Sequence, residues 1–508
     1  MNHAPGLIPC ESNTFFLMLS VECYFIWLFA NIKPELRYYF YQLDIASDMY
    51  DRTRDVENLL SNPRRALLSM SLPLLFALIV ENLQTFVDGV WCSGLGSEAM
   101  SAISLAQPIY GMIAAVGTGI GIGVSAAIAK YIGAADKESA DNVIVGTLLL
   151  VIVLSVISSI ALWFAAEPLI IFCGGAESVE LSMEYTRPFL FLSFFLMMNA
   201  VWAGMLRAEG AARRSMALSI IASLINIVLD PILIYGMDLG VLGASLATCI
   251  SFITITAIAF WWYLSGRMYV SMKFKDYHYK RVTVMEVLII GIPCIIEMIL
   301  QPLISVPQNA VVYSCGGEEG FVAYIYAFRF IEIALIPAIA IGKSLIPIIS
   351  AGIGQNDSKK IMESCKLTYK YTLTMEFFFL IFIFITADFL VNAFMNSESM
   401  ATIHDEMTLA LRIYSLTCIF HTCRIVGTSI LQATRHAVVA SVLTLCRELM
   451  FLSSFMIAAT ISMHAIYWAC DLTNFIMMFV ITIFAFHYLK KLVSDMNSKT
   501  IKNQTFRL

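Results

Sequence analysis

Charged residues are scarce in this chain of 508 residues: Asp, Glu, Lys and Arg make up only 14 % of it, whereas 59 % is hydrophobic. Average soluble domains carry about 25 % charged residues, so the composition excludes an ordinary soluble protein. The apolar stretches occupy nearly the whole length and leave no room for a soluble catalytic domain. We therefore expect no enzyme and no catalytic residues. The short alternating segments of a membrane β-barrel are absent as well.

Paired cysteine motifs are also lacking. The chain has twelve cysteines, but they are scattered, and none forms a Cys-x-x-Cys pair or a His/Cys group with zinc spacing. Most lie inside apolar runs, where a thiol behaves as a small hydrophobic group. We expect neither a disulfide framework nor a bound cofactor; examples of such cysteines are Cys249, Cys294, Cys446 and Cys470.

Long apolar runs are abundant. Each is long enough to cross a hydrocarbon core of roughly 30 Å, and a backbone in lipid must satisfy its own hydrogen bonds, which favours helices. The predicted fold is an all-α polytopic membrane protein with twelve core transmembrane helices. Their expected ranges are 66–90, 104–128, 143–165, 185–207, 213–236, 241–264, 284–313, 321–347, 368–390, 407–432, 436–459 and 463–489.

The twelve predicted helices form one six-helix unit written twice. A shift of about 220 residues superimposes Pro73 on Pro293, Gly96 near Gly317, Gly133 on Gly354 and Leu206 on Leu431. Because six is even, both copies enter the membrane from the same side and are parallel repeats. Transporters that alternate access between two halves are built in this way.

The loops give the two sides of the membrane opposite charge. Lys and Arg gather in the connections on one side, and acidic residues in those on the other, which predicts cytoplasmic core termini. The expected parts are an N-lobe (63–264), a cytoplasmic linker (265–283), a C-lobe (284–489) and a cytoplasmic tail (490–508). The predicted protein crosses the cell membrane many times.

Residues 1–62 form an N-terminal extension with two interpretations. The run 14–30 is apolar but short, is interrupted by Glu22, and lacks the basic start of a signal peptide. It is either an extra membrane helix or a product of a start site assigned too early, in which case Met49 opens the protein. No function is predicted for this extension.

The run GTGIGIG, from Gly117 to Gly123, falls within a predicted span. Such glycines let helices approach backbone to backbone in a membrane. Close packing is the favoured interpretation, and a moving hinge is the alternative.

Intramembrane carboxylates are the residues that indicate function, because a charge at mid-membrane is costly. Asp88 lies in FVDGVW and Asp230 in NIVLDPIL, with Asn226 one helical turn before Asp230. Thr248, in the next predicted helix, adds a hydroxyl. Carboxylate, amide and hydroxyl oxygens suit a hard cation such as Na⁺, and a desolvated carboxylate also holds a proton. These four residues are the predicted cation-coupling site; the alternative is that each Asp only bonds a neighbouring helix.

Two further acids are candidates. Glu81 precedes Asp88 by two helical turns and shares its face, so it either adds a second titrating group to the same chamber or faces sideways. Glu297 follows Pro293 in the predicted seventh helix. We expect Arg329 to pair with Glu332, and Arg447 with a nearby acid.

Several segments together resemble the multidrug and toxic compound extrusion (MATE) transporters. They are LSMSLPLLFALIVENLQTFVDGVWCSGLGSEAMSAISLAQPI, IAKYIGAADKESADN, MLRAEGAARRSM and NIVLDPILIYGMDLGVLGASLAT. The resemblance covers residues 50–490 and is nearest to the archaeal DinF-like branch. It implies two six-helix lobes around a V-shaped cavity. It also implies a monomer that exports organic, often cationic, compounds against an inward flow of protons or sodium ions.

The resemblance places the family's N-lobe cation site on Asp88, Asn226, Asp230 and Thr248. This chain departs from the branch at Glu81, where the relatives carry Gln. It also has His421 where a related branch has a second-lobe acid, while Glu297 matches that branch's acid in the seventh helix. The expected mechanism is competition: cation binding at the two Asp residues bends the first helix near Pro73 and expels the substrate.

Two other functions stay open at this point. A flippase for lipids or lipid-linked sugars belongs to the same superfamily but would line its cavity with bases. An intramembrane metal-dependent prenyltransferase would need paired Asp-rich motifs facing the cytoplasm. The expected partners are a small-molecule substrate and the lipid bilayer, with no nucleic acid.

Overall fold

The computed structural model of this chain describes residues 54–274, 277–394 and 403–505, and all regular secondary structure in these ranges is helical. The apolar run 14–30 and Met49, on which the interpretation of the N-terminal extension depends, lie outside the described residues.

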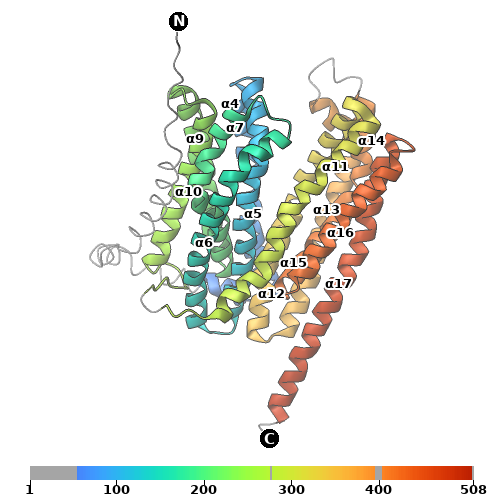
Figure 1. Ribbon diagram of the computed structural model, residues 1–508. Helices are drawn as coiled ribbons and strands as arrows, with labels where there is room; N and C mark the ends of the chain where they lie inside the picture. The colour runs from blue at the N-terminus through green and yellow to red at the C-terminus, as the bar shows by residue number, and fades with distance from the viewer. Residues whose placement is uncertain (1–53, 275–276, 395–402, 506–508) are drawn as a thin grey trace.

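The helices fall into two halves that lie side by side (Figure 1). The first half contains α4 (Pro63–Ser93), α5 (Ser97–Gly133), α6 (Lys137–Phe172), α7 (Val179–Phe191), α8 (Ser193–Ala208), α9 (Ala212–Pro231), the π-helix η1 (Ile232–Gly236) and α10 (Gly240–Leu264). The second half contains α11 (Arg281–Ala334), α12 (Ile336–Gln355), α13 (Ser358–Phe394), α14 (His404–Tyr414), α15 (Thr417–Ala433), α16 (Ala437–Ala458) and α17 (Met463–Thr505).

The prediction of twelve spans is confirmed, although the helix boundaries differ from those expected. Ten helices are long and apolar enough to cross a membrane, and two bent pairs bring the number to twelve, with bends of 60° at α7–α8 and 43° at α14–α15. A straight helix of the 54 residues assigned to α11 would measure roughly 80 Å. The backbone of Gly317, with φ 60° and ψ −159°, instead divides α11 into an outgoing and a returning segment. Only Leu335 separates the returning segment from α12, and the two together match the single expected span 321–347, so the number of spans stays twelve.

The internal repeat extends to backbone geometry. Gly96 and Gly317, one in each half, both have positive φ, at 94° and 60°. Ala135 and Asn356 also correspond, with φ values of 57° and 55°. An alanine rarely adopts this left-handed conformation. In both halves the next residue is an Asp whose side chain accepts a backbone N–H of the following helix. The two halves therefore turn from their second to their third helix in the same way.

The glycine run of α5 lets helices pack on two of its faces. A Cβ on Gly117 would lie 2.6 Å from Met197 Cα of α8, and one on Gly123 would lie 2.3 Å from the Val287 carbonyl oxygen of α11. Gly119 and Gly291 approach each other in the same way, between α5 and α11. Close packing, the favoured interpretation of the run, is what the structure shows. Because α11 begins the second half, these glycines also hold the two halves together.

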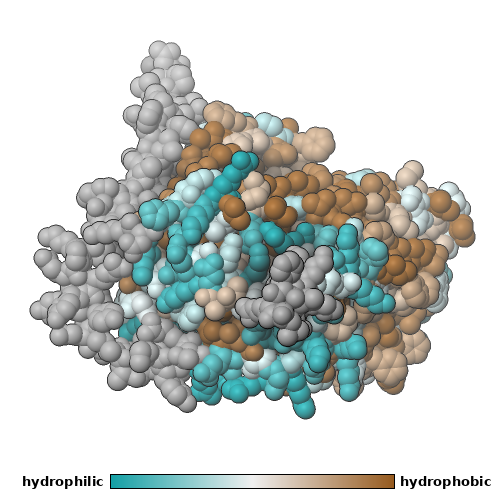
Figure 2. Space-filling view, turned by 90° about the horizontal axis from the view of Figure 1, so that it is seen from below, coloured by the Kyte–Doolittle hydropathy of each residue, from teal (hydrophilic) through white to brown (hydrophobic). Residues whose placement is uncertain are grey.

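The halves are also joined at the end where the α5–α6 and α12–α13 turns lie, the lower end in Figure 1. Glu286 Oε1 of α11 lies 2.7 Å from Lys130 Nζ of α5 and 3.2 Å from Arg435 of the α15–α16 turn. A Cβ on Gly354 would lie 2.0 Å from the Lys130 carbonyl oxygen. Seen from this end, hydrophilic residues gather over the middle of the face (Figure 2). Above it, the helices of the two halves diverge toward the top of Figure 1.

The segment between the halves is non-helical at residues 265–274 and 277–280. Glu209, in the α8–α9 turn, anchors it by accepting the backbone N–H groups of Tyr269 and Val270 at 2.8 and 3.1 Å. Burial raises the pKa of the Glu209 carboxyl to about 7, although these two hydrogen bonds and Arg214 act in the opposite direction.

We predict that Gly123→Ala lowers the stability of the protein, because the new methyl group collides with the α11 backbone. Overpacking of this kind typically costs about 1–3 kcal/mol. The matched control is Gly111→Ala in the same helix, where nothing lies within 4 Å of the new Cβ. Thermal unfolding of both variants in detergent is the measurement, and equal unfolding temperatures would contradict the packing role.

A second prediction concerns pH. A carboxyl group whose pKa is higher in the folded state retains its proton above pH 4.5, where the unfolded chain has lost it. Its contribution to stability therefore falls between about pH 4.5 and 7. Glu209→Gln keeps an acceptor without the charge, so the unfolding temperature of this variant relative to wild type should rise from pH 5 to pH 8. A difference that does not change with pH would show that Glu209 does not titrate in this range.

Candidate cation and substrate site

The four residues predicted for the cation site meet in the first half, on α4, α9 and α10. Asp88 lies in the outer part of α4, and Thr248 is on α10. Asn226 and Asp230 are four residues apart in α9, so their side chains share one face of that helix. Each of these two is only 1 % exposed, while Asp88 and Thr248 line a cavity.

Asn226 is the central hydrogen-bonding group of this cluster. Its Nδ2 lies 3.4 Å from Asp230 Oδ1 and 3.3 Å from Thr248 Oγ1. Rotating the amide by 180° places the nitrogen 2.8 Å and 3.2 Å from the two carboxylate oxygens of Asp88, and the oxygen then accepts from the Thr248 hydroxyl. In either orientation the amide connects a carboxylate to the hydroxyl.

The carboxyl groups of Asp88 and Asp230 both lie within 3.4 Å of the Asn226 amide, and they interact with each other. Two neighbouring carboxylates repel, and where burial removes water from them they do not both stay ionised without compensation. One proton shared between them, or one cation held by both, removes the repulsion. Asp230 Oδ2 is buried and has no hydrogen-bond partner among the described residues. The cluster therefore has a free acceptor for a proton or a metal ion.

Two neighbours complete the cluster and were missed in the sequence. Gln84 Nε2 donates to Asn226 Oδ1 at 2.6 Å, and Gln84 Oε1 accepts from the Ser223 hydroxyl at 2.7 Å. Helical spacing to the predicted site residues could have identified both neighbours. Gln84 is one turn before Asp88 on α4, and Ser223 is one turn before Asn226 on α9. These bonds tie α4 to α9 at the level of the carboxylates.

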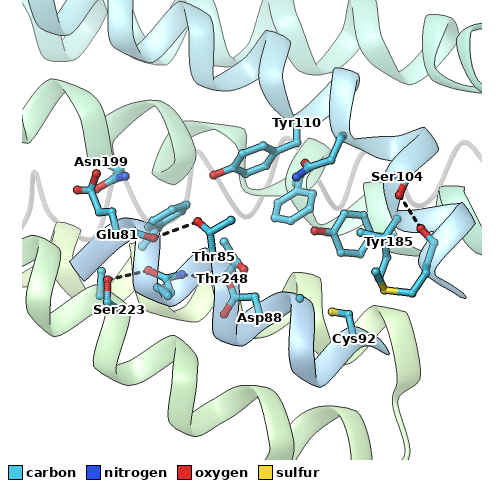
Figure 3. A pocket seen from close by; sticks show the side chains of 18 of the residues that line it. Glu81, Thr85, Asp88, Cys92, Ser104, Tyr110, Tyr185, Asn199, Ser223 and Thr248 are labelled. Carbon is cyan, nitrogen blue, oxygen red and sulfur yellow. Dashed lines mark hydrogen bonds between the residues drawn. The ribbon is translucent and has the colours of Figure 1, made fainter. Parts of the chain in front are cut away.

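The cluster opens into a cavity of about 540 Å³. Figure 3 shows its wall, with Asp88 and Thr248 near one another and Glu81 farther along α4. Glu81 is exposed and accepts the Ser219 hydroxyl of α9 at 2.9 Å. The structure therefore places Glu81 in the same chamber as Asp88. The other lining groups include aromatic and amide side chains, among them Tyr110, Tyr185, Phe189, Phe252, Gln107 and Asn199.

The second half contributes one base to this cavity. Arg329, on the returning segment of α11, is exposed and lines the same wall as Asp88. The sequence predicted a pair between Arg329 and Glu332. The two side chains interact electrostatically, but no ion pair within 4 Å joins them in the described part of the chain. Arg329 is therefore a cavity residue that the sequence reading missed.

Glu297 lies on α11, in the second half of the protein. It interacts with Arg424 of α15, which in turn interacts with Arg447 and Glu448 of α16. Arg447 forms a buried ion pair with the adjacent Glu448, which supplies the acid expected near Arg447. His421 contacts Arg424. Glu297 is thus not part of the N-lobe cluster, and its position in the second half is rich in bases.

The backbone changes form directly after the cation cluster. Pro231 has no N–H, and after it the chain continues as the π-helix η1, in which the Met237 N–H donates to the Ile232 carbonyl at 2.8 Å. Short π-helical segments are frequent at functional sites. Here the segment begins two residues after Asp230, so the carboxylate lies at the end of the regular part of α9.

Two parallel six-helix halves, with charged groups gathered in a cavity between spans, are typical of membrane transporters built from internal repeats. The sequence profile of the MatE family matches residues 73–232 and 293–451, one stretch in each half. The chain belongs to the MatE family and is a MATE-type transporter rather than an enzyme.

Two named relatives are similar to this chain over more than half of its length. The FAD transporter of Shewanella oneidensis is 26 % identical over 336 residues, which cover 64 % of this chain and 73 % of the relative. The multidrug export protein MepA of Staphylococcus haemolyticus is 28 % identical over 308 residues, covering 58 % of this chain and 66 % of that protein.

Solved structures agree with the fold. A MOP superfamily transporter from Pyrococcus furiosus, described as having reverse polarity of its binding pocket, superimposes with a TM-score of 0.82 at 29 % identity. A MATE transporter in complex with MaL6 has the same TM-score at 28 % identity. Both comparisons cover 86 % of this chain and 98 % of the other. The DinF-like branch remains a prediction from the sequence.

We predict that a cation stabilises the wild-type protein and that Asp88→Asn and Asp230→Asn abolish this effect. A ligand present at about 100 times its Kd adds roughly 2.7 kcal/mol to the stability. The measurement is the unfolding temperature in detergent as Na⁺ replaces choline, and as pH is varied without Na⁺. Glu297→Gln is the matched control, because its carboxylate lies near Arg424. A cation effect that survives in both Asp variants would remove the cluster from the mechanism.

Proposed function

We propose that the protein is a cation-coupled antiporter that exports small organic molecules by alternating access of its two halves. The observation that supports the proposal is the interaction between the Asp88 and Asp230 carboxyl groups, with Asn226 and Thr248 beside them. A proton or a sodium ion that enters from outside relieves their repulsion. The chamber that holds the pair also holds Glu81, so the substrate and the cation compete for one acidic wall.

The geometry suits an outward-facing state. The halves are held together where Lys130, Glu286 and Arg435 meet, and the cavity at Asp88 lies toward the opposite end of α4. The Lys and Arg content of the loops makes the joined end cytoplasmic. In the proposed cycle, cation binding bends α4 near Pro73 and narrows the chamber. The substrate then leaves, and the halves rock about their interface to open inward. The protein acts as a monomer in the cell membrane.

The substrate class follows from the cavity and the relatives together. The mixture of carboxylate, amide and aromatic groups around the chamber accepts organic cations. One relative is named for the transport of FAD and another for multidrug export, so organic molecules of drug or cofactor size are the proposed cargo. Among the described residues, the chamber is lined by the acids Glu81 and Asp88 and by the single base Arg329, which is not the basic lining expected of a lipid flippase. No paired Asp-rich motif in the described residues favours the prenyltransferase.

The test is ethidium efflux from proteoliposomes, with an inward proton gradient or an inward sodium gradient imposed separately. One gradient should drive efflux, and that gradient identifies the coupling ion. Asp88→Asn and Asp230→Asn should each reduce driven efflux to the rate of protein-free liposomes, because a neutral amide neither binds the proton nor neutralises the metal ion.

The control for these variants is Asp238→Asn, the same change at an exposed loop acid outside the cavity, which should transport normally. Full transport by both site variants would refute the coupling site. Absence of ethidium efflux under either gradient, from protein shown to be folded, would refute drug export.

A further inference from the structure

Lys343 is a charged side chain in the middle of a membrane-spanning helix whose neighbouring residues are buried. It lies in the middle of α12, and it is the exposed residue in a stretch, 334–352, whose other residues are buried or, at one position, half-buried. Lipid does not explain this exposure, because an ammonium group at mid-span faces protein interior or water. Ala340, one turn earlier, packs on Leu74 and Ala77 of α4. Lys343 therefore extends into the space that α12 and α4 enclose between the halves.

A second base lies near Lys343. Arg207, in the last turn of α8, is half-buried, and its charge interacts with that of Lys343. Both bases also interact with Glu81, which lies one turn beyond Ala77 on α4. No hydrogen bond or ion pair within 4 Å joins either base to a side chain in the described residues. We call Arg207 and Lys343 the inner basic pair.

The charges of this group do not balance. Glu81 is the carboxylate that interacts with both bases, and it is already engaged by the Ser219 hydroxyl. The pair therefore carries one positive charge more than the single carboxylate that interacts with both of its members, and a mobile anion that joins the group would balance this charge. If the pair existed only to neutralise Glu81, one base would be enough.

We infer that the inner basic pair binds an anionic group of the transported molecule, so that the protein prefers amphoteric substrates to purely cationic ones. This inference rests on the proposed function. The acidic wall at Asp88 and Glu81 accepts the cationic end of such a molecule, and Lys343 with Arg207 accepts its carboxylate or phosphate. The inference concerns the substrate, whereas Asp88 and Asp230 concern the coupling ion.

The experiment compares two dyes that share one cationic ring system. Rhodamine 110 carries a free carboxylate, and rhodamine 123 is its methyl ester. Binding to the purified protein in a neutral detergent is followed by fluorescence anisotropy, without any gradient. Wild type should bind rhodamine 110 more tightly. Lys343→Gln should weaken rhodamine 110 binding about tenfold, the effect of one lost charge-assisted contact, and should change rhodamine 123 binding less than about twofold.

Two variants show whether charge is the cause. Lys343→Arg retains the cation and should restore the preference for the free acid. Lys359→Gln removes an exposed lysine at the start of α13, which lines none of the cavities described here, and should leave both affinities unchanged. Equal affinity of wild type for the two dyes, or equal weakening of both dyes by Lys343→Gln, would overturn the inference.

A second set of titrations tests whether the inner basic pair binds the anionic group of a lipid instead. The same titrations are carried out in nanodiscs of phosphatidylcholine and of phosphatidylglycerol. Equal rhodamine 110 affinity in both assigns the pair to the substrate, whereas a lower affinity in phosphatidylglycerol alone would assign it to lipid phosphate and overturn the inference. Because binding is measured without a gradient, a failed efflux assay leaves this result intact, and an unchanged dye preference leaves the efflux result intact.

Discussion

The cost of a charge inside the membrane is the constraint on which the rest of this structure depends. A chain with 14 % charged residues has few to place, and several of those that fall within its spans are grouped. Asp88 and Asp230 interact with each other, Arg447 pairs with Glu448, and Lys343 and Arg207 lie near Glu81. Each group lies where helices of different origin meet, and none is a chance surface charge. The positions of these groups therefore trace the functional interior of the protein.

The two halves share their backbone geometry but differ in which corresponding positions carry charged side chains. At the offset of 220 residues, Gln301 and Gln308 of α11 stand where Glu81 and Asp88 stand in α4. Both glutamines donate to Glu448, with Gln308 Nε2 at 2.8 Å from its carbonyl oxygen and 3.3 Å from its carboxylate. Glu448 is also paired with Arg447. The second half thus carries a built-in guanidinium in its polar cluster, while the first half leaves two carboxylates without a fixed cation. This difference favours the first half as the place where an exchangeable ion binds.

The sequence predicted the architecture because that depends on composition, period and repeat. The twelve spans and the close packing at Gly117–Gly123 needed no knowledge of distant contacts, and the four oxygen-bearing residues of the cation cluster followed from spacing and cost. The contacts between the two halves could not be predicted from the sequence. The partners of Arg329 and Lys343 depend on how the second half rests against the first, which no local pattern encodes. The 60° bend between α7 and α8 depends on tertiary packing in the same way.

In the proposed mechanism, helix α4 connects the bound ion to the position of the two halves. Its outer part carries Asp88 and is bound to α9 through Gln84 and Ser223, whereas its inner part packs Leu74 and Ala77 on Ala340 of the second half. Pro73 lies in the inner part and has no N–H to donate, so the helix is weakest near its contact with α12. A ligand shifts such an element only by binding one state more tightly than the other. An ion that bridges Asp88 and Asp230 meets this condition, because it draws α4 toward α9 and so changes how the same helix rests on α12.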